Sequence, residues 1–177
     1  MKRSELEHVI RAAGTIAGER QIVVIGSQAI LGQFPEASGI LARSAEADVF
    51  PLDRPERSEL IDGPIGEGSP FHEEYGYYAQ GVDEHTAILP DGWRDRLIRI
   101  ENANTDGKIG LCLEVHDLAI SKYVAGREKD LEFTAELARH AMTVVSTLRE
   151  RLKLTTHPAL TAQRRKIVEG RIRHDFA

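Results

Sequence analysis

The hydrophobic positions at the start of the chain are spaced as in a helix. Apolar residues recur every three or four positions over 6–13, which predicts an amphipathic helix that the glycines after it end. Ser4 and Glu7 form an S-x-x-E pair, which predicts a capping box at the start of this helix. Residues 21–25 then form a β-branched run, so we expect a buried strand there.

Polar and apolar side chains alternate over 46–50, which is the period of a strand with one buried face. The other elements expected before residue 116 are short helices at 27–31 and 55–61, a Gly- and Pro-rich loop at 62–72, and strands at 77–82, 86–89, 97–100 and 109–115. After residue 115 the apolar spacing is helical, and helices are expected at 116–124, 129–140, 146–152 and 158–172.

This order of elements predicts an α+β (or α/β) fold. We expect a small mixed β-sheet core with flanking helices over 1–115, and a helical C-terminal unit over 116–177 packed on that core. The length of 177 residues agrees with one compact domain, or with one domain and a small helical addition.

The composition narrows the class of protein. Hydrophobic residues make up 41% and charged residues 29%, which is close to the globular norm and argues against wholesale disorder. The longest apolar run is 22–26, far below the roughly 18 residues of a membrane span, and the N-terminus lacks the apolar segment of a secretory signal. A single cysteine, Cys112, excludes an internal disulfide and a Cys-rich zinc site. We therefore expect a cytoplasmic protein with no membrane partner.

Charge is spread unevenly along the chain. Residues 139–177 hold nine Lys and Arg and three acids, which gives this segment a net charge of +6. Since the whole chain has a net charge of −5, residues 1–138 carry a net charge of −11. This asymmetry is typical of an acidic active-site body with a basic arm for a polyanion, or of two solvated helix faces.

Glu46 and Asp48 are the first candidate site residues. At positions i and i+2 of a strand, their carboxylates point to the same face. Two such charges repel one another unless a cation neutralises them, and Mg²⁺ prefers carboxylate oxygens completed by water and phosphate. The alternative is a solvent-exposed strand edge, where the pair costs little.

Two further segments contain groups that bind phosphate. Gly26 and Ser27 join a strand to a short helix, and the glycine, the helix N-terminus and the hydroxyl suit a phosphate group, although an ordinary capped turn has the same pattern. Lys122 and Lys129 are seven residues apart, so we expect both on one helix face, with Arg127 and Asp130 nearby. This cluster suits a triphosphate, or it is a solvated face with ordinary ion pairs.

The segments 24–31 and 117–130 together resemble a known superfamily. A strand ending in hydrophobic-Gly-Ser, followed by a strand that reads acid-hydrophobic-acid-hydrophobic, resembles the active-site layout of the polymerase-β-like nucleotidyltransferases. Lys122 and the segment 127–130 resemble the downstream signature of the AbiEii/MenT-type nucleotidyltransferase toxins and related small bacterial nucleotidyltransferases. The similarity covers about residues 5–152.

The resemblance implies a nucleotidyltransferase core over 1–115 and a role for each matched residue. Glu46 and Asp48 are the implied ligands of one or two Mg²⁺ (or Mn²⁺) ions. Gly26 and Ser27 are the implied contacts of the nucleotide β- and γ-phosphates. Ser44, just before the acidic pair, is a further implied phosphate contact.

The implied roles of the later residues concern the leaving group and the acceptor. Lys122 offsets the charge on the departing pyrophosphate, and Arg127 binds nucleotide. Asp130 orients Lys122 or helps to deprotonate the acceptor hydroxyl. These assignments make Glu46, Asp48, Lys122 and Asp130 the expected catalytic residues.

The sequence departs from the superfamily pattern in three ways. Glu46 stands where most members have Asp, and an inserted loop over 33–41 is expected near the site. The third carboxylate that is common on a later strand is not identified by the pattern. Asp83, Glu101 and Glu114 are its candidates, or none of them serves.

The expected function is transfer of NMP from an NTP to a macromolecular acceptor, with the tRNA 3′ end as acceptor and a toxin–antitoxin pair as the setting. The basic C-terminal segment fits an RNA acceptor. An antitoxin-like enzyme that nucleotidylates a partner toxin is the main variant. A non-catalytic nucleotide-binding domain and a small-molecule nucleotidyltransferase are the other two alternatives.

Overall fold

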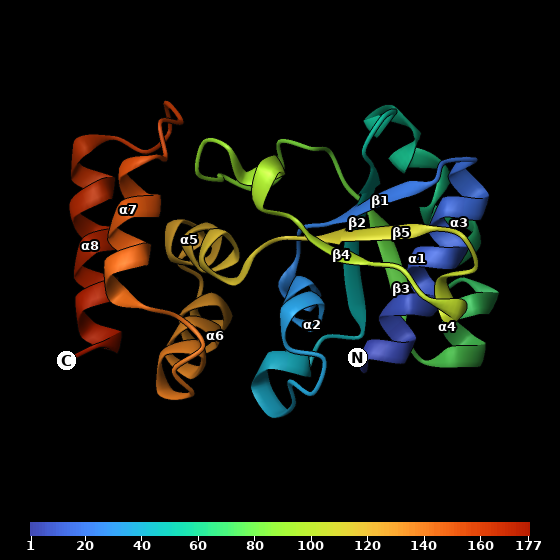
Figure 1. Cartoon of the computed structure of the whole chain (residues 1–177), viewed down its shortest axis with the longest axis horizontal. Helices are drawn as coiled ribbons and strands as arrows, with labels where there is room; N and C mark the ends of the chain where they lie inside the picture. Colours follow the sequence, from blue (N-terminus) through green and yellow to red (C-terminus); the bar gives the residue numbers. More distant parts are fainter. The chain divides into compact units, whose positions relative to one another are not determined.

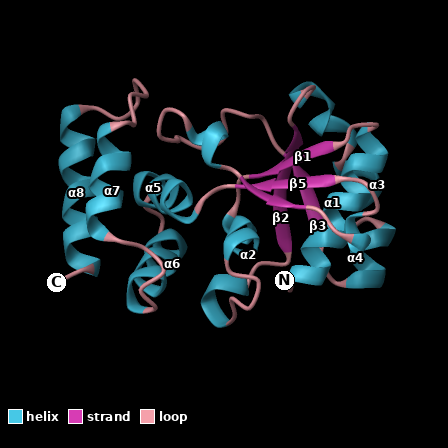
Figure 2. Cartoon of the chain, in the orientation of Figure 1, coloured by secondary structure: helices cyan, strands magenta, loops and turns pink.

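The computed structural model describes residues 1–177, and these form two compact units (Figure 1). The first unit comprises 1–86 and 97–113, and the second comprises 87–96 and 114–177. All five strands belong to the first unit, whereas the second unit contains only helices and loops (Figure 2). The mixed α/β class is therefore confirmed, while the division into domains at residue 115 stays a prediction.

The first unit contains α1 (Arg3–Ala17), β1 (Gln21–Val24), α2 (Ile30–Gln33), β2 (Glu46–Pro51), α3 (Asp62–Ile65), α4 (Pro70–Tyr75), β3 (Tyr78–Gly81), β4 (Ile98–Ile100) and β5 (Ile109–Cys112), with 3₁₀ helices at Ser27–Ala29, Gly39–Ala42, Pro55–Leu60 and Ala103–Thr105. The second unit contains a 3₁₀ helix at Trp93–Arg96 and the helices α5 (Val115–Ala125), α6 (Glu128–Arg139), α7 (Val145–Lys153) and α8 (Ala162–Asp175).

The sheet of the first unit has the strand order β3-β2-β1-β5-β4. The central strand β1 pairs antiparallel with β2 and parallel with β5, while β3 is parallel to β2 and β4 antiparallel to β5. The three buried β-branched residues that follow Gln21 in β1 fit a strand with a neighbour on each side.

Helix α1 covers one face of this sheet. A Cβ on Gly110 of β5 would lie 2.4 Å from a side-chain atom of α1, so this residue faces the helix. Gly110 is in register with Ile22 of β1, which in turn is in register with Pro51 of β2. Because side chains alternate along a strand, Ala47 and Val49 also face α1, and both are fully buried.

Two expectations about the elements before residue 116 are wrong. The segment 62–72 is not one loop, because α3 occupies its start and α4 begins at Pro70, with a turn over 66–69 between them. Pro70 opens α4, where the backbone N–H of His72 donates to the Ser69 hydroxyl, and Gly76 ends it at φ 76°. The predicted strand 86–89 has no partner strand.

The start of α1 is also capped differently from the prediction. The carboxylate of Glu5, and not that of Glu7, accepts the backbone N–H of Lys2 at 2.6 Å. Glu7 is buried and accepts hydrogen bonds from the side chains of Asn102 and Asn104, at 2.8 and 2.7 Å. A capping pattern covers only a few neighbouring residues, so it cannot predict hydrogen-bond partners that lie almost a hundred residues away.

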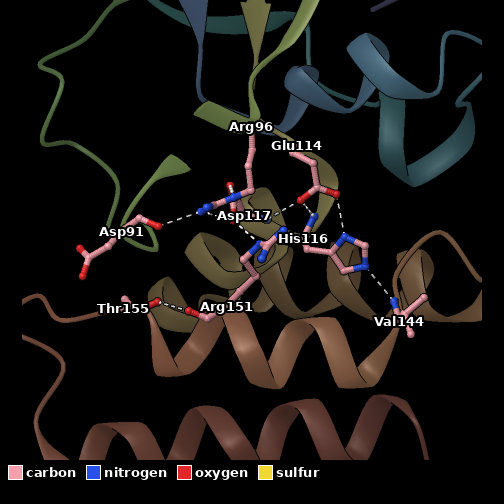
Figure 3. A network of polar contacts seen from close by, with 8 residues as sticks. All are labelled: Asp91, Arg96, Glu114, His116, Asp117, Val144, Arg151 and Thr155. Carbon is pink, nitrogen blue, oxygen red and sulfur yellow. Dashed lines mark hydrogen bonds and ion pairs between the residues drawn. The ribbon is translucent and has the colours of Figure 1, made fainter. Parts of the chain in front are cut away.

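A buried carboxylate organises the second unit (Figure 3). The side chain of Asp117, on the first turn of α5, is completely buried. Nε of Arg96 lies 2.8 Å from its Oδ2, and Nε of Arg151 on α7 lies 3.1 Å from its Oδ1. Arg96 also donates to the backbone carbonyl of Asp91 at 3.1 Å, so one network joins 87–96, α5 and α7.

No helix in the chain has the length and apolar character that crossing a membrane requires.

Candidate active site

Glu46 and Asp48 share the face of β2 that is opposite α1. They alternate with the buried Ala47 and Val49, and both carboxylate residues remain partly exposed. The predicted common face is therefore confirmed. The structure brings Gly26 and Asp48 together as well, because β1 and β2 are adjacent and the backbone N–H of Ile25 donates to the carbonyl of Asp48 at 3.1 Å.

The need for glycine at position 26 comes from this close approach. Its φ of −78° suits any residue. A Cβ there, however, would lie 2.0 Å from Oδ2 and 2.8 Å from Cγ of Asp48. Gly26 thus leaves space in which the Asp48 carboxylate lies against the strand-to-helix turn. This is the arrangement required if one ligand contacts both the carboxylate and the turn.

We expect Gly26→Ala to displace the Asp48 carboxylate and to weaken nucleotide binding at least tenfold, with a loss of about 1–3 kcal/mol in the free energy of unfolding. Titration of a fluorescent NTP analogue and urea unfolding measure the two effects. Gly63→Ala is the matched control, because a Cβ there has no neighbour within 4 Å. Equal nucleotide affinity in both variants would contradict the role given to Gly26.

Tyr78 is a site residue that the sequence pattern did not identify. It lies in register with Glu46 on the adjacent strand β3, and its hydroxyl donates to Oε2 of Glu46 at 2.9 Å. Burial, together with this hydrogen bond to the carboxylate, raises the pKa of Tyr78 to about 12. The phenol therefore stays protonated at neutral pH and holds Glu46 in one orientation. The contact between Tyr78 and Glu46 follows from the pairing of β2 with β3, which the sequence alone does not show.

Two further polar residues, Gln28 after the Gly26 turn and Ser44 before β2, belong to the same part of the chain. Gln28 is completely buried, and its Oε1 has no hydrogen-bond partner in the chain. The Ser44 hydroxyl accepts the backbone N–H of Glu46 at 3.1 Å and donates to the carbonyl of the same residue at 3.2 Å. Ser44 thus fixes the start of β2, and its predicted phosphate contact stays a prediction.

These residues fit a divalent cation that a nucleotide helps to hold. The protein offers two carboxylates on one face, a glycine where a Cβ would fill the space beside Asp48, and an unpaired buried amide oxygen at Gln28. No group of three or more His, Cys, Asp or Glu side chains is close enough to hold a metal by itself. Two carboxylates completed by water and phosphate oxygens are a common Mg²⁺ environment in phosphoryl-transfer sites.

The three candidates for a third carboxylate have other positions or partners. Glu101 accepts from Arg20, which precedes β1, so it lies at the end of β1 opposite to Ser27. Asp83 follows β3 at the end remote from Tyr78, and its Oδ1 accepts the backbone N–H of His85 at 2.8 Å.

Glu114 is used within the second unit. Its carboxylate caps α5 by accepting the backbone N–H of His116, and it also contacts Nδ1 of that ring at 2.7 Å. Burial acts to raise the pKa of Glu114, but the hydrogen bonds from the side chain and backbone of His116 and from the backbone of Asp117 outweigh burial and lower it. Nε2 of His116 in turn contacts the backbone N–H of Val144 at 3.0 Å, so Glu114 belongs to the network of Figure 3.

Lys122, Arg127 and Asp130 form an ion cluster in the second unit. Nζ of Lys122 lies 3.4 Å from Oδ1 of Asp130, and Nε of Arg127 lies 2.7 Å from its Oδ2. Asp130 is buried, and this burial acts to raise its pKa. The hydrogen bond from Arg127 and the charge of Lys122 prevail and hold the pKa of Asp130 below its usual value. Asp130 thus forms ion pairs with both Lys122 and Arg127, and its predicted catalytic role stays a prediction.

Lys122 and Lys129 do not share a helix face, contrary to expectation. Gly126 adopts φ 66° and ends α5, and α6 begins at Glu128, so the two lysines belong to different helices. The glycine provides the left-handed conformation that closes a helix at low cost.

The lowered pKa of Asp130 predicts an acid-sensitive contribution to stability. Because the folded pKa lies below the unfolded value of about 4, this contribution is present above that pH and is lost as the pH falls through the folded pKa. Between pH 6 and pH 3, we expect wild type to lose about 1–3 kcal/mol more than Asp130→Asn. Urea unfolding followed by fluorescence of Trp93, in the same unit, measures this difference. Identical losses in the two proteins would contradict the prediction.

Comparison with known proteins identifies a family for the chain. Residues 4–168 match a protein family described as a nucleotidyltransferase of unknown function (DUF6036). The match includes both the Gly26 turn with the acidic pair of β2 and the ion cluster of the second unit. No curated protein and no solved structure matches the chain. Because the match covers most of its length, the chain belongs to this DUF6036 family of nucleotidyltransferases.

Proposed function

We propose that this protein is an Mg²⁺-dependent (or Mn²⁺-dependent) nucleotidyltransferase of the cytoplasm, which transfers NMP from an NTP to an RNA acceptor, with tRNA as the substrate class. The observation that carries the proposal is the close approach of Gly26 to Asp48, on the sheet face that also presents Glu46. This arrangement supports the proposal, because a strand-to-helix turn can bind phosphate and two neighbouring carboxylates can bind a divalent cation.

Each residue has a role that its surroundings support. Glu46 and Asp48 hold the cation, which when bound stabilises the attacking and leaving oxygens of an in-line displacement. Tyr78 keeps Glu46 in position through its hydrogen bond. Gly26 and Ser27 bind the β- and γ-phosphates, and Ser44 keeps the start of β2 in place beside them.

On the basis of the resemblance over 117–130, we propose that the ion cluster of the second unit supplies positive charge to the leaving group. Lys122 offsets the charge that develops on pyrophosphate, and Arg127 binds the nucleotide. Asp130 orients Lys122 through their ion pair. The low pKa of Asp130 favours this orienting role over that of a general base, because a weakly basic carboxylate accepts a proton poorly.

The biological setting we propose is a toxin of a toxin–antitoxin pair, on the basis of the resemblance over 117–130. Nucleotidylation of a partner protein is the second candidate, favoured by the acidic character of residues 1–138, which carry a net charge of −11. The two candidates differ in which macromolecule acquires the nucleotide.

Label transfer tests the proposal and separates the two acceptors. The protein is incubated with Mg²⁺, each of the four α-labelled NTPs, total tRNA and lysate protein. We expect label on RNA, and only when Mg²⁺ or Mn²⁺ is present. Label confined to a protein band would overturn the RNA acceptor, and the absence of any transfer to either class would overturn the proposed function.

A further inference from the structure

The structure separates the basic C-terminal segment into two groups of cations. Five of the nine Lys and Arg side chains of 139–177 have partners within the chain: Arg139 pairs with Glu136, Arg151 with Asp117, and Arg164, Arg165 and Arg171 donate to backbone carbonyls. The other four have no ion-pair or hydrogen-bond partner and are exposed: Arg149, Lys153, Lys166 and Arg173. These four side chains are therefore the cations whose N–H donors are not already used within the chain.

Three of these four cations line one groove. It lies between α7 and α8, which run side by side (Figure 1), and has a volume of about 290 Å³. Arg149 and Lys153 contribute from α7 and Arg173 from α8, above a floor formed by the buried Leu152 and Ile172. Since Arg149 and Lys153 are four residues apart, they lie about 6 Å apart along the axis of α7.

The two walls of the groove are fixed to one another. Arg165 of α8 donates to the backbone carbonyls of Leu152 and Thr155, at 2.5 and 2.8 Å, and so ties α8 to the C-terminal end of α7. Glu169 is the one acid that lines the groove, and it makes no salt bridge. The groove is thus a fixed site with an excess of positive charge, in which the free cations need not break an existing ion pair to bind an anion.

The lining favours a phosphodiester chain over a peptide helix. An amphipathic helix needs a series of apolar contacts along a groove, and Leu152 and Ile172 provide only two. No aromatic side chain lines the groove, so stacking on bases is absent and the contacts are with phosphate. Successive phosphates instead match cations that are presented from both walls.

We propose that the α7–α8 groove binds the phosphate backbone of single-stranded RNA through Arg149, Lys153 and Arg173. The inference rests on the proposed function for the identity of RNA as the acceptor. It adds a binding site within the second unit that acts without reading the base sequence.

Equilibrium binding of the full chain to a short fluorescein-labelled oligouridylate tests the groove. Each phosphate contact with a single strand contributes about −0.7 to the slope of log K against log salt, so three contacts give a slope of about −2. Wild-type affinity should then fall about 20-fold between 50 and 200 mM KCl. The triple variant Arg149→Gln/Lys153→Gln/Arg173→Gln should show a slope near zero, and each single variant should reduce its magnitude by about 0.7.

Lys166→Gln is the matched control. It removes an equally exposed and unpaired cation of α8 that lies outside the groove, so its salt slope should equal that of wild type. If Lys166→Gln and Lys153→Gln changed the salt slope equally, or if the triple variant kept the wild-type slope, the proposal that the groove binds RNA would be overturned. If poly-L-glutamate at equal charge concentration displaced the RNA, the ligand of the groove would be an acidic protein segment and not RNA. Because binding needs no turnover, failure here is distinguishable from failure of nucleotide transfer, which the label assay measures separately.

Discussion

Replacement of Asp48 by asparagine should lower the rate of nucleotide transfer about a thousandfold. The substitution keeps the size of the side chain, so the close approach to Gly26 is preserved, but it removes one of the two negative charges that we propose as cation ligands. Charge stabilisation by a catalytic metal is worth several kcal/mol, and a loss of about 4 kcal/mol corresponds to this factor. The effect should fall on the rate of transfer, because the substitution changes the charge of the side chain and not its size.

The measurement is the initial rate of label transfer at saturating NTP and Mg²⁺. Glu101→Gln is the matched control, because it also converts a carboxylate to an amide in the first unit, but at the end of β1 remote from Ser27. It should retain the wild-type rate. An Asp48→Asn rate within tenfold of wild type would show that β2 does not hold the catalytic cation.

Asp117→Asn should lower the free energy of unfolding of the second unit by about 3 kcal/mol. Burial raises the pKa of Asp117, and the guanidinium groups of Arg96 and Arg151 oppose that rise. The carboxylate and the two guanidinium groups therefore stabilise one another in their charged forms. With the carboxylate removed, two largely buried guanidinium groups lose their counter-charge. The cost is thus the desolvation of the two arginines that remain.

Urea unfolding followed by Trp93 fluorescence measures this loss, since the only tryptophan of the chain lies in the 3₁₀ helix that carries Arg96. Asp91→Asn, an exposed carboxylate of the same unit, should cost less than about 1 kcal/mol. The triple variant Arg96→Met/Asp117→Leu/Arg151→Met should be more stable than Asp117→Asn, because no unpaired charge remains. A triple variant that is less stable than the single one would contradict this account.

Local patterns in the sequence predicted the acidic pair well. Alternation over 46–50 was sufficient to place Glu46 and Asp48 on one face, because burial of Ala47 and Val49 fixes the opposite face. The strand before Gly26 was equally clear from its β-branched residues. Both features depend on neighbours within a few positions, which is the range over which a hydrophobic pattern is informative.

Contacts between distant segments were not predicted. The hydrogen bond from Tyr78 to Glu46 depends on the pairing of β2 with β3, which the sequence does not specify. The approach of Gly26 to Asp48 depends in the same way on β1 and β2. The prediction that Lys122 and Lys129 share a helix face was wrong for a local reason. Gly126 ends α5, and a glycine at this position could have been recognised in the sequence as a helix stop.

The pairing of β1 with β5 has a consequence for how the chain folds. Gln21 is in register with Ile109, so the central parallel pair of the sheet closes a loop of 88 residues. Between these strands the chain also passes through 87–96, which belongs to the second unit. Closing so long a loop is entropically unfavourable before its contacts form, so refolding should take milliseconds to seconds rather than microseconds. A fragment cut after residue 86 would lack β4 and β5, leaving one edge of β1 without its partner strand.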